Sequence, residues 1–389
     1  MLAPLFVCAR ICVVQRGTII QQRNKWCLRF YETILKDGAE VRKKSFRVLA
    51  PVSKDHPNKT SVVPLADKIL APINSGTLVP ESSQRLIDFI DSHYLPDAKK
   101  VLRPSTHKGY KDIVEIHLRK RLGDVLVRDF RTVHGQRLMA QIPNVGHKTL
   151  MRIRATLSAV FAYALRTGVL DGHNPMHAVS VPGRPKKYKP LTYTLEESAK
   201  IAAAVHHNDA AFVAITNATF AGLRLSEIRG LRWSDLDSSM LRVQRSVWRT
   251  QVGPTKTEES EAPVPVIPAL KFVLEKYRGK INPKPEDYIL AGERKGAPLN
   301  LHNLANRVIK PALKEKGLEW KGWKAWRSGL ASALYALKVS PKVIAAILRH
   351  DPLTSWKFYI DAPDEESVAA MVNIQEWFTA IEERNDESL

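Results

Sequence analysis

The chain has 389 residues, of which 44% are hydrophobic and 25% charged, and its formal net charge is +21. This length is too great for one ordinary domain and fits two or three, and the hydrophobic fraction is sufficient for real cores. Residues 1–190 hold 33 Lys and Arg against 14 Asp and Glu, whereas residues 191–389 hold 27 against 25. The first half therefore indicates a surface for a polyanion, which could be DNA, RNA or an anionic membrane.

Three observations narrow the class of protein. The three cysteines, Cys8, Cys12 and Cys27, are odd in number and form no C-x-x-C pair, so we expect reduced thiols in a cytoplasmic protein rather than a zinc site. The apolar run 1–14 is interrupted by Arg10 and is too short to span a membrane; it could be a packing strand or an extension upstream of the true start. Because the sequence has neither a GxxxxGK[ST] loop nor clustered carboxylates, we expect no cofactor and no metal.

Residues 1–50 predict a small three-stranded β domain. A strand over Gly17–Gln21 is followed by period-2 alternation from Trp26 to Tyr31 and by a third strand over Val41–Val48. A sheet with one basic face can sit in the major groove of DNA. The candidate DNA-binding residues of this domain are Arg29, Arg42, Lys43 and Lys44. Residues 51–80 contain five prolines and are expected to form a linker.

Residues 81–181 predict an all-α bundle that binds DNA. One helix is expected over Thr106–Leu122, with Gly123 just beyond its end, and another over Lys148–Arg166. The cations of the second helix lie off its apolar stripe, which is typical either of a solvated face or of phosphate contact, and we favour phosphate contact. Its candidate residues are Lys148, Arg152 and Arg154. Residues 182–191 form a basic linker in which Arg184, Lys186 and Lys187 are further candidates.

The remaining residues, 192–389, predict a mainly helical domain with a small antiparallel sheet. Helices are expected over Ala211–Thr219 and Leu225–Leu231, and a core helix over Ser328–Leu337. Strands over Leu241–Val247 and Pro263–Ile267 are expected to flank a hairpin. The complete chain is therefore expected to be a multidomain α+β protein.

Four short segments carry the functional signal. They are AGLRLSEIRGLRWSD at 221–235, TKT at 255–257, KAWR at 324–327 and RHDPLTSWKFY at 349–359. In this order they resemble the tyrosine recombinase (phage integrase) family, most specifically over residues 192–361 and more loosely over 81–181 and 16–50. An arginine beside a helix N-terminus, as expected for Arg224, can hold phosphate oxygens, and Glu227 can support its guanidinium. A surface salt bridge is the plainer alternative for this pair.

The resemblance implies a role for each of these positions. Tyr359 would be the nucleophile, Arg224 and Arg327 would clamp the phosphate, and His350 would donate to a nonbridging oxygen. Lys256 would be the general acid that protonates the departing 5′ oxygen. Lys324 occupies the position where the family usually has histidine, so it keeps a charge for the phosphate but is a poor proton acceptor. The family usually has glycine where Arg349 stands.

The implied function is site-specific recombination through a 3′-phosphotyrosyl bond, which preserves the phosphodiester's energy without ATP or metal. The implied partners are double-stranded DNA, three further copies of the chain in a tetramer and, as an optional accessory, a DNA-bending or directionality factor, with no membrane. We expect the protein in the cytoplasm with the nucleoid. An amphipathic helix over 364–381 would pack on its own domain or on a neighbouring subunit. The alternatives are a catalytically impaired DNA-binding relic and a topoisomerase IB-like strand nicker.

Overall fold

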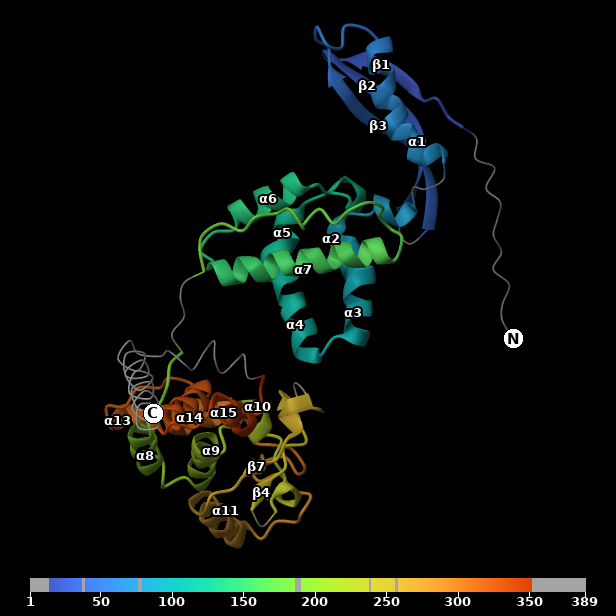
Figure 1. Cartoon of the computed structure of the whole chain (residues 1–389). Helices are drawn as coiled ribbons and strands as arrows, with labels where there is room; N and C mark the ends of the chain where they lie inside the picture. The colour runs from blue at the N-terminus through green and yellow to red at the C-terminus, as the bar shows by residue number, and fades with distance from the viewer. Residues whose placement is uncertain are drawn as a thin grey trace, which may run out of the picture. The chain divides into compact units, whose positions relative to one another are not determined.

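The computed structural model describes residues 14–36, 39–75, 79–185, 190–237, 239–255 and 258–351. The chain divides into two compact units, residues 1–186 and residues 187–389. The first unit has an N-terminal antiparallel sheet followed by helices, and the second is mainly helical with two small antiparallel sheets (Figure 1). This layout confirms the predicted multidomain α+β class. The apolar run 1–14 lies almost entirely outside the described residues, as do Cys8 and Cys12.

The sheet of the first unit has the order β1-β2-β3, with both neighbouring pairs antiparallel. Its strands are β1 (Thr18–Gln22), β2 (Lys25–Lys36) and β3 (Ala39–Pro51). On one face, Leu28 and Phe30 are buried against helix α1 (Val63–Asn74), through Ala66 and Leu70. The alternation predicted for β2 therefore arises because one side of the strand contacts this helix.

The prediction of a linker over 51–80 was wrong, because α1 lies within it. Pro64 falls in the first helical turn, where its missing N–H has no intrahelical partner to lose. Ala66 and Leu70 are four residues apart and so share the face that packs on the sheet. The proline content of this segment was therefore a misleading signal, and the sheet gains its core from the residues that follow it.

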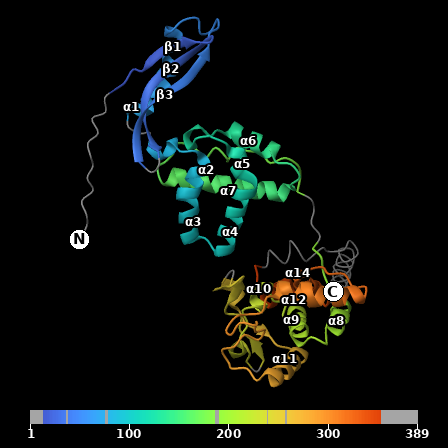
Figure 2. The same ribbon diagram turned by 180° about the vertical axis from the view of Figure 1, so that it is seen from behind.

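The helical part of the first unit consists of two interrupted helices and two continuous ones. Figure 2 shows α7 crossing beside the paired α3 and α4, which Figure 1 shows from the other side. The elements are α2 (Leu86–Phe89), a π-helical turn (Ile90–Tyr94), α3 (Leu95–Val101), α4 (Pro104–Ile113), a second π-helical turn (Val114–Leu118), α5 (Arg119–Leu122), α6 (Thr132–Gln141) and α7 (His147–Arg166). The helix expected from Thr106 starts two residues earlier, because Pro104 can open a helix. Its end before Gly123 agrees with the prediction.

The second unit surrounds α9 (Asp209–Phe220), which packs against α8, α10, α11 and α14. Eight of the nine residues from Ala211 to Thr219 are buried, so this helix is enclosed on all sides by its neighbours. The other elements of this unit are α8 (Leu195–Ala204), α10 (Leu225–Ile228), β4 (Met240–Leu241), β5 (Ser246–Trp248), β6 (Gln251–Gly253), β7 (Val264–Pro265), α11 (Pro268–Ile281), α12 (Leu301–Leu304), a π-helical turn (Ala305–Ile309), α13 (Lys310–Glu315), α14 (Lys324–Ala336) and α15 (Pro341–Leu348).

One strand prediction in this unit was wrong, and one predicted helix is present but starts earlier. The strand expected over Leu241–Val247 is broken into β4 and β5, which pair with β7 and with β6 respectively. The tight β5–β6 hairpin was missed because Arg249 takes a left-handed conformation at φ 55°, with no glycine to mark the turn. The core helix expected from Ser328 begins at Lys324, and Leu337 lies at its end with 72% of its surface exposed.

Candidate functional site

Three chain segments meet at the turn that precedes α10. Gly222 adopts φ +56° there, and a Cβ on it would lie 2.7 Å from Leu348 and 2.9 Å from Leu330. Only glycine fits this close approach without displacing a neighbour, so the turn lies directly on α14 and the end of α15. This packing brings Arg224, Arg327 and the residues after Leu348 together from positions far apart in the sequence.

Arg224 is held by side chains from two elements and keeps part of its surface in solvent. Its Nη1 donates to Oε1 of Glu227 at 2.6 Å and to Oγ of Ser260 at 2.8 Å. Glu227 also accepts from the backbone N–H of Arg224 through Oε2 at 2.9 Å, so the carboxylate both caps α10 and holds the guanidinium. The Arg224 side chain remains 26% exposed. A held but accessible guanidinium is suited to binding an anion.

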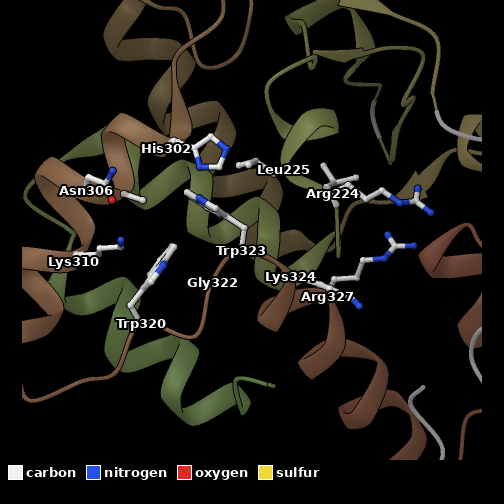
Figure 3. Close-up of a pocket in the computed structure, with 12 residues that line it drawn as sticks. Arg224, Leu225, His302, Asn306, Lys310, Trp320, Gly322, Trp323, Lys324 and Arg327 are labelled. Carbon is white, nitrogen blue, oxygen red and sulfur yellow. The ribbon is translucent and has the colours of Figure 1, made fainter. Parts of the chain in front are cut away.

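Arg327 lies beside Arg224 and is more deeply buried, with 5% of its surface exposed. Its Nη1 donates to the carbonyl of Gly222 at 2.8 Å, and its Nη2 donates to the carbonyl of Leu348. Figure 3 shows both guanidinium groups pointing to the same side, away from Trp320 and Lys310. Both arginines line one cavity of about 420 Å³. Two cations fixed in this way make a candidate site for an anion on the second unit.

His350 follows α15 and is 9% exposed. Burial lowers the pKa of its imidazole below the usual value, and the positive charge of Arg327 lowers it further. The imidazole is therefore neutral at pH 7. Its Nδ1 lies 3.2 Å from the carbonyl oxygen of Asp351, which can only accept a hydrogen bond. In the neutral form this contact places the hydrogen on Nδ1 and the lone pair on Nε2.

Two more polar groups complete the cluster. Lys324 is exposed at the start of α14 and lines the same cavity as Arg224 and Arg327. Arg349 is fully buried, and its Nη2 donates to Oε2 of Glu227 at 2.7 Å. Burial by itself would raise the pKa of Glu227, but the charges of Arg349 and Arg224 outweigh it and hold this pKa below the ordinary value. The Glu227 carboxylate is therefore ionised at neutral pH.

The rest of the cavity wall was missed by sequence reasoning. His302, Asn306 and Lys310 lie four residues apart along the helical stretch that runs from α12 into α13, and all three are exposed. Trp320 and Trp323 form another part of the wall, as Figure 3 shows. Polar residues at four-residue spacing opposite buried leucines would have been a usable signal for this face.

A second, larger cavity of about 860 Å³ lies on the same unit and is lined by the exposed cations Arg249, Arg294 and Arg307. A third lies between these two, since it shares Arg224 and His302 with the first and Arg249 with the second. The hollows thus follow one another from the paired arginines to the β5–β6 hairpin. We call this row of hollows the groove of the second unit, and its extent was not predicted from the sequence.

The comparisons with known proteins decide the family. Residues 192–366 match the model described as the phage integrase family. These residues are therefore similar to the tyrosine recombinases of that family. A protein named "Tyrosine recombinase XerC-like" from Caldanaerobacter subterraneus subsp. tengcongensis is 23% identical over 325 residues, which cover 74% of this chain and 82% of the relative. Cleavage and transfer of DNA strands is the activity that this family implies.

Solved integrase structures share the fold. The Tn1549 transposon integrase in complex with transposon right end DNA is 17% identical, covers 75% of this chain and 100% of its own, and has a TM-score of 0.61. A lambda integrase dimer bound to a COC′ core site is 20% identical, with 88% and 94% coverage and a TM-score of 0.56. A lambda integrase tetramer bound to a Holliday junction is 18% identical, with 87% and 93% coverage and a TM-score of 0.55. Coverage of 88% exceeds the second unit and the helical part of the first combined.

The structure places some predicted residues of the recombinase and leaves others outside the described ranges. Tyr359, Lys256 and the helix expected over 364–381 lie outside them, as do Lys186 and Lys187. The first unit contains Arg29, Arg42 and Lys44 on the sheet face opposite α1, where Arg42 lies 5.2 Å from the ring centre of Tyr31. Lys43 points to the other face, across from Glu32.

The candidates on the long helix and the linker divide into two groups. Lys148, Arg152 and Arg184 are exposed. Arg154 is half-buried and donates to the carbonyl of His177 at 2.7 Å, which ties α7 to the segment that follows it. Among the described residues, no helix combines the length and apolar character needed to cross a lipid bilayer.

Proposed function

We propose that this chain is a site-specific DNA recombinase, an integrase of a phage or another mobile element. The main support is the convergence of Arg224, Arg327 and His350 from three distant segments within a domain of the phage integrase family. Two fixed guanidinium groups match the geometry of a phosphodiester, whose nonbridging oxygens carry the negative charge. Lys324 adds a third cation on the exposed side of this pair.

Tyr359 is the proposed nucleophile, nine residues after His350 in the sequence. Its phenol oxygen would bond to phosphorus and the bond from phosphorus to the 5′ oxygen would break, which leaves a 3′-phosphotyrosyl bond and a free 5′ hydroxyl. Arg224 and Arg327 would stabilise the charge of the pentavalent transition state. Attack by a 5′ hydroxyl from another strand reverses the step, and exchange of partners between the two steps gives recombination.

Proton transfer also needs named groups. Lys324 stands where the family usually has histidine, and a lysine is a poor acceptor for the phenol proton. His350 is neutral, with its lone pair on Nε2, and would accept that proton and then donate it to a nonbridging oxygen. Lys256 would protonate the departing 5′ oxygen, since an alkoxide is a poor leaving group. Glu227 holds Arg224 in place through two hydrogen bonds.

The proposed partners are double-stranded DNA and further copies of this chain. The basic sheet face of residues 1–50 would bind arm-type sites, residues 81–181 would bind the core site, and the groove of the second unit would follow the backbone near the cleaved bond. By analogy with the lambda integrase tetramer on a Holliday junction, four copies would form the synapse. A DNA-bending or directionality factor could assist, and the complex would be found on the nucleoid.

A nicked suicide duplex from the DNA that flanks the gene tests this function. The protein and its Tyr359→Phe variant are incubated with the duplex in EDTA, and a covalent protein–DNA band is sought on a denaturing gel. A band with the wild type alone supports the proposal. Binding without any band would favour a catalytically impaired relic, and Lys324→His would then be the first substitution to restore activity. Relaxation of plasmids of any sequence would instead favour a topoisomerase IB-like nicker.

A further inference from the structure

Arg349 is the most deeply buried cation of the site, with a fully buried side chain beside a Glu227 side chain that is 1% exposed. Besides its 2.7 Å bond to Glu227, its Nη1 donates to the carbonyl of Ser260 at 3.4 Å. Its own backbone carbonyl accepts from Nη2 of Arg224 at 3.3 Å. One residue thus contacts α10, the turn at 258–261 and Arg224.

The backbone of Arg349 makes this position unusual. It ends α15 in the left-handed region, at φ 53° and ψ 64°, where glycine is strongly favoured because it has no Cβ. The residue next to it in the chain is His350. A large charged side chain at such a position requires contacts that offset the strain, and the bonds to Glu227 and Ser260 are the contacts observed.

The charges show what these contacts achieve. The two oxygens of Glu227 are divided, with Oε1 bound to Arg224 and Oε2 bound to Arg349. Glu227 and Arg224 alone would form a neutral pair with little attraction for a phosphate. With Arg349 the three groups carry a net charge of +1, and the exposed member that can present this charge to an anion is Arg224.

We infer that Arg349 is a positioning residue that compensates the charge of Glu227 and thereby leaves the positive charge of Arg224 for the scissile phosphate. The inference rests on the proposed recombinase function. Arg349 does not touch DNA in this account; it acts through Glu227, which aligns the Arg224 guanidinium, and through Ser260, which lies four residues after Lys256. The 258–261 turn is thereby tied to the end of α15.

The test compares Arg349→Met, Arg349→Gly and Arg349→Lys with wild-type protein on the suicide duplex. The single-turnover rate of adduct formation, DNA affinity and the melting temperature are measured for each. We expect the Arg349→Met and Arg349→Gly variants to form the adduct about 10- to 100-fold more slowly, the usual effect of misplacing a catalytic group. Affinity should change little, because it is spread over many phosphate contacts. The Arg349→Lys variant keeps a positive charge opposite Glu227 and should recover most of the rate of adduct formation.

Lys338→Gly is the matched control. Lys338 is an exposed cation in the left-handed region at φ 61°, at the end of α14, so this variant also removes a charge and relieves a strained backbone. It should cleave at the wild-type rate. The inference would be overturned if the Arg349→Gly variant folds and forms the adduct as fast as the wild type. It would also be overturned if Arg349→Lys and Arg349→Met form the adduct equally slowly. Failure of the wild type to form any adduct would refute the proposed function, and the inference with it.

Discussion

Replacing Gly222 by alanine should separate the packing of the site from its chemistry. The new Cβ would meet Leu348 at 2.7 Å and Leu330 at 2.9 Å, and the residue would keep φ +56°. The left-handed conformation costs about 1–2 kcal/mol for a residue with a Cβ. Overpacking of a filled core adds about 1–3 kcal/mol. We therefore expect Gly222→Ala to lower the free energy of unfolding by about 2–5 kcal/mol, from the sum of these two effects.

Gly317→Ala isolates the backbone effect. Gly317 adopts φ +65° in the same unit, but a Cβ there would meet no atom within 4 Å. This variant should lose only about 1–2 kcal/mol, the conformational cost alone. Urea unfolding followed by tryptophan fluorescence reports on this unit, because Trp26 is the only one of the eight tryptophans outside residues 187–389.

The same pair of variants tests how the site is assembled. Leu348 carries the carbonyl that accepts from Arg327 and precedes Arg349, so a shift of Leu348 would move both. Gly222→Ala should therefore slow adduct formation under conditions where both variants are folded, whereas Gly317→Ala should not. Equal losses of stability in the two variants, together with equal cleavage rates, would refute the claim that the Gly222 turn fixes the site by close packing.

Three further predictions concern protonation, a buried ion pair and DNA binding. The folded pKa of His350 is lowered, so its contribution to stability is present above the unfolded value of about 6.5 and is lost as pH falls from there through the folded pKa. The acid limb of adduct formation at limiting DNA should lie below about 6.5 and disappear in His350→Gln. Arg128→Met leaves the buried Glu32 without the guanidinium that lies 2.8 Å from it, and chemical denaturation should show the first unit destabilised by about 3–5 kcal/mol. The double variant Arg128→Met with Glu32→Met should recover much of this lost stability. Affinity for DNA should fall steeply with salt, and Arg42→Ala should reduce the slope of log affinity against log salt by about one, whereas a flat response would exclude phosphate tracking by the first half.

The sequence was most informative where local patterns determine structure. The alternation around Leu28 and Phe30 and the apolar stripe of α7 each predicted a real element, because each pattern reflects one buried face. The order of the four motifs also located Arg224, Arg327 and His350, which the fold brings together. Residue spacing alone could not supply that proximity, since it depends on the turn at Gly222 packing on Leu348.

Contacts between distant segments were beyond the reach of sequence reasoning. Ser260 holds Arg224 from 36 residues away and carries no pattern that distinguishes it from other serines. The bond between Arg349 and Glu227 spans 122 residues. The short strands β4 to β7 were misassigned for a related reason, because two- and three-residue strands are defined by their partners and not by their own composition.

Net charge per half of the chain predicts a surface for a polyanion in the first unit, which stays a prediction, and it does not show where the cations of the second unit lie. In the first unit, several arginines are paired with carboxylates of the same unit, as in Arg47–Asp129, Arg85–Asp88 and Arg119–Asp91. The excess of positive side chains therefore lies in other cations, such as those on the sheet face. The second half has nearly equal numbers of both signs, yet its groove is lined by Arg249, Arg294 and Arg307. Attraction for DNA depends on the field at a surface, and this field is set by where the charges lie, not by their sum.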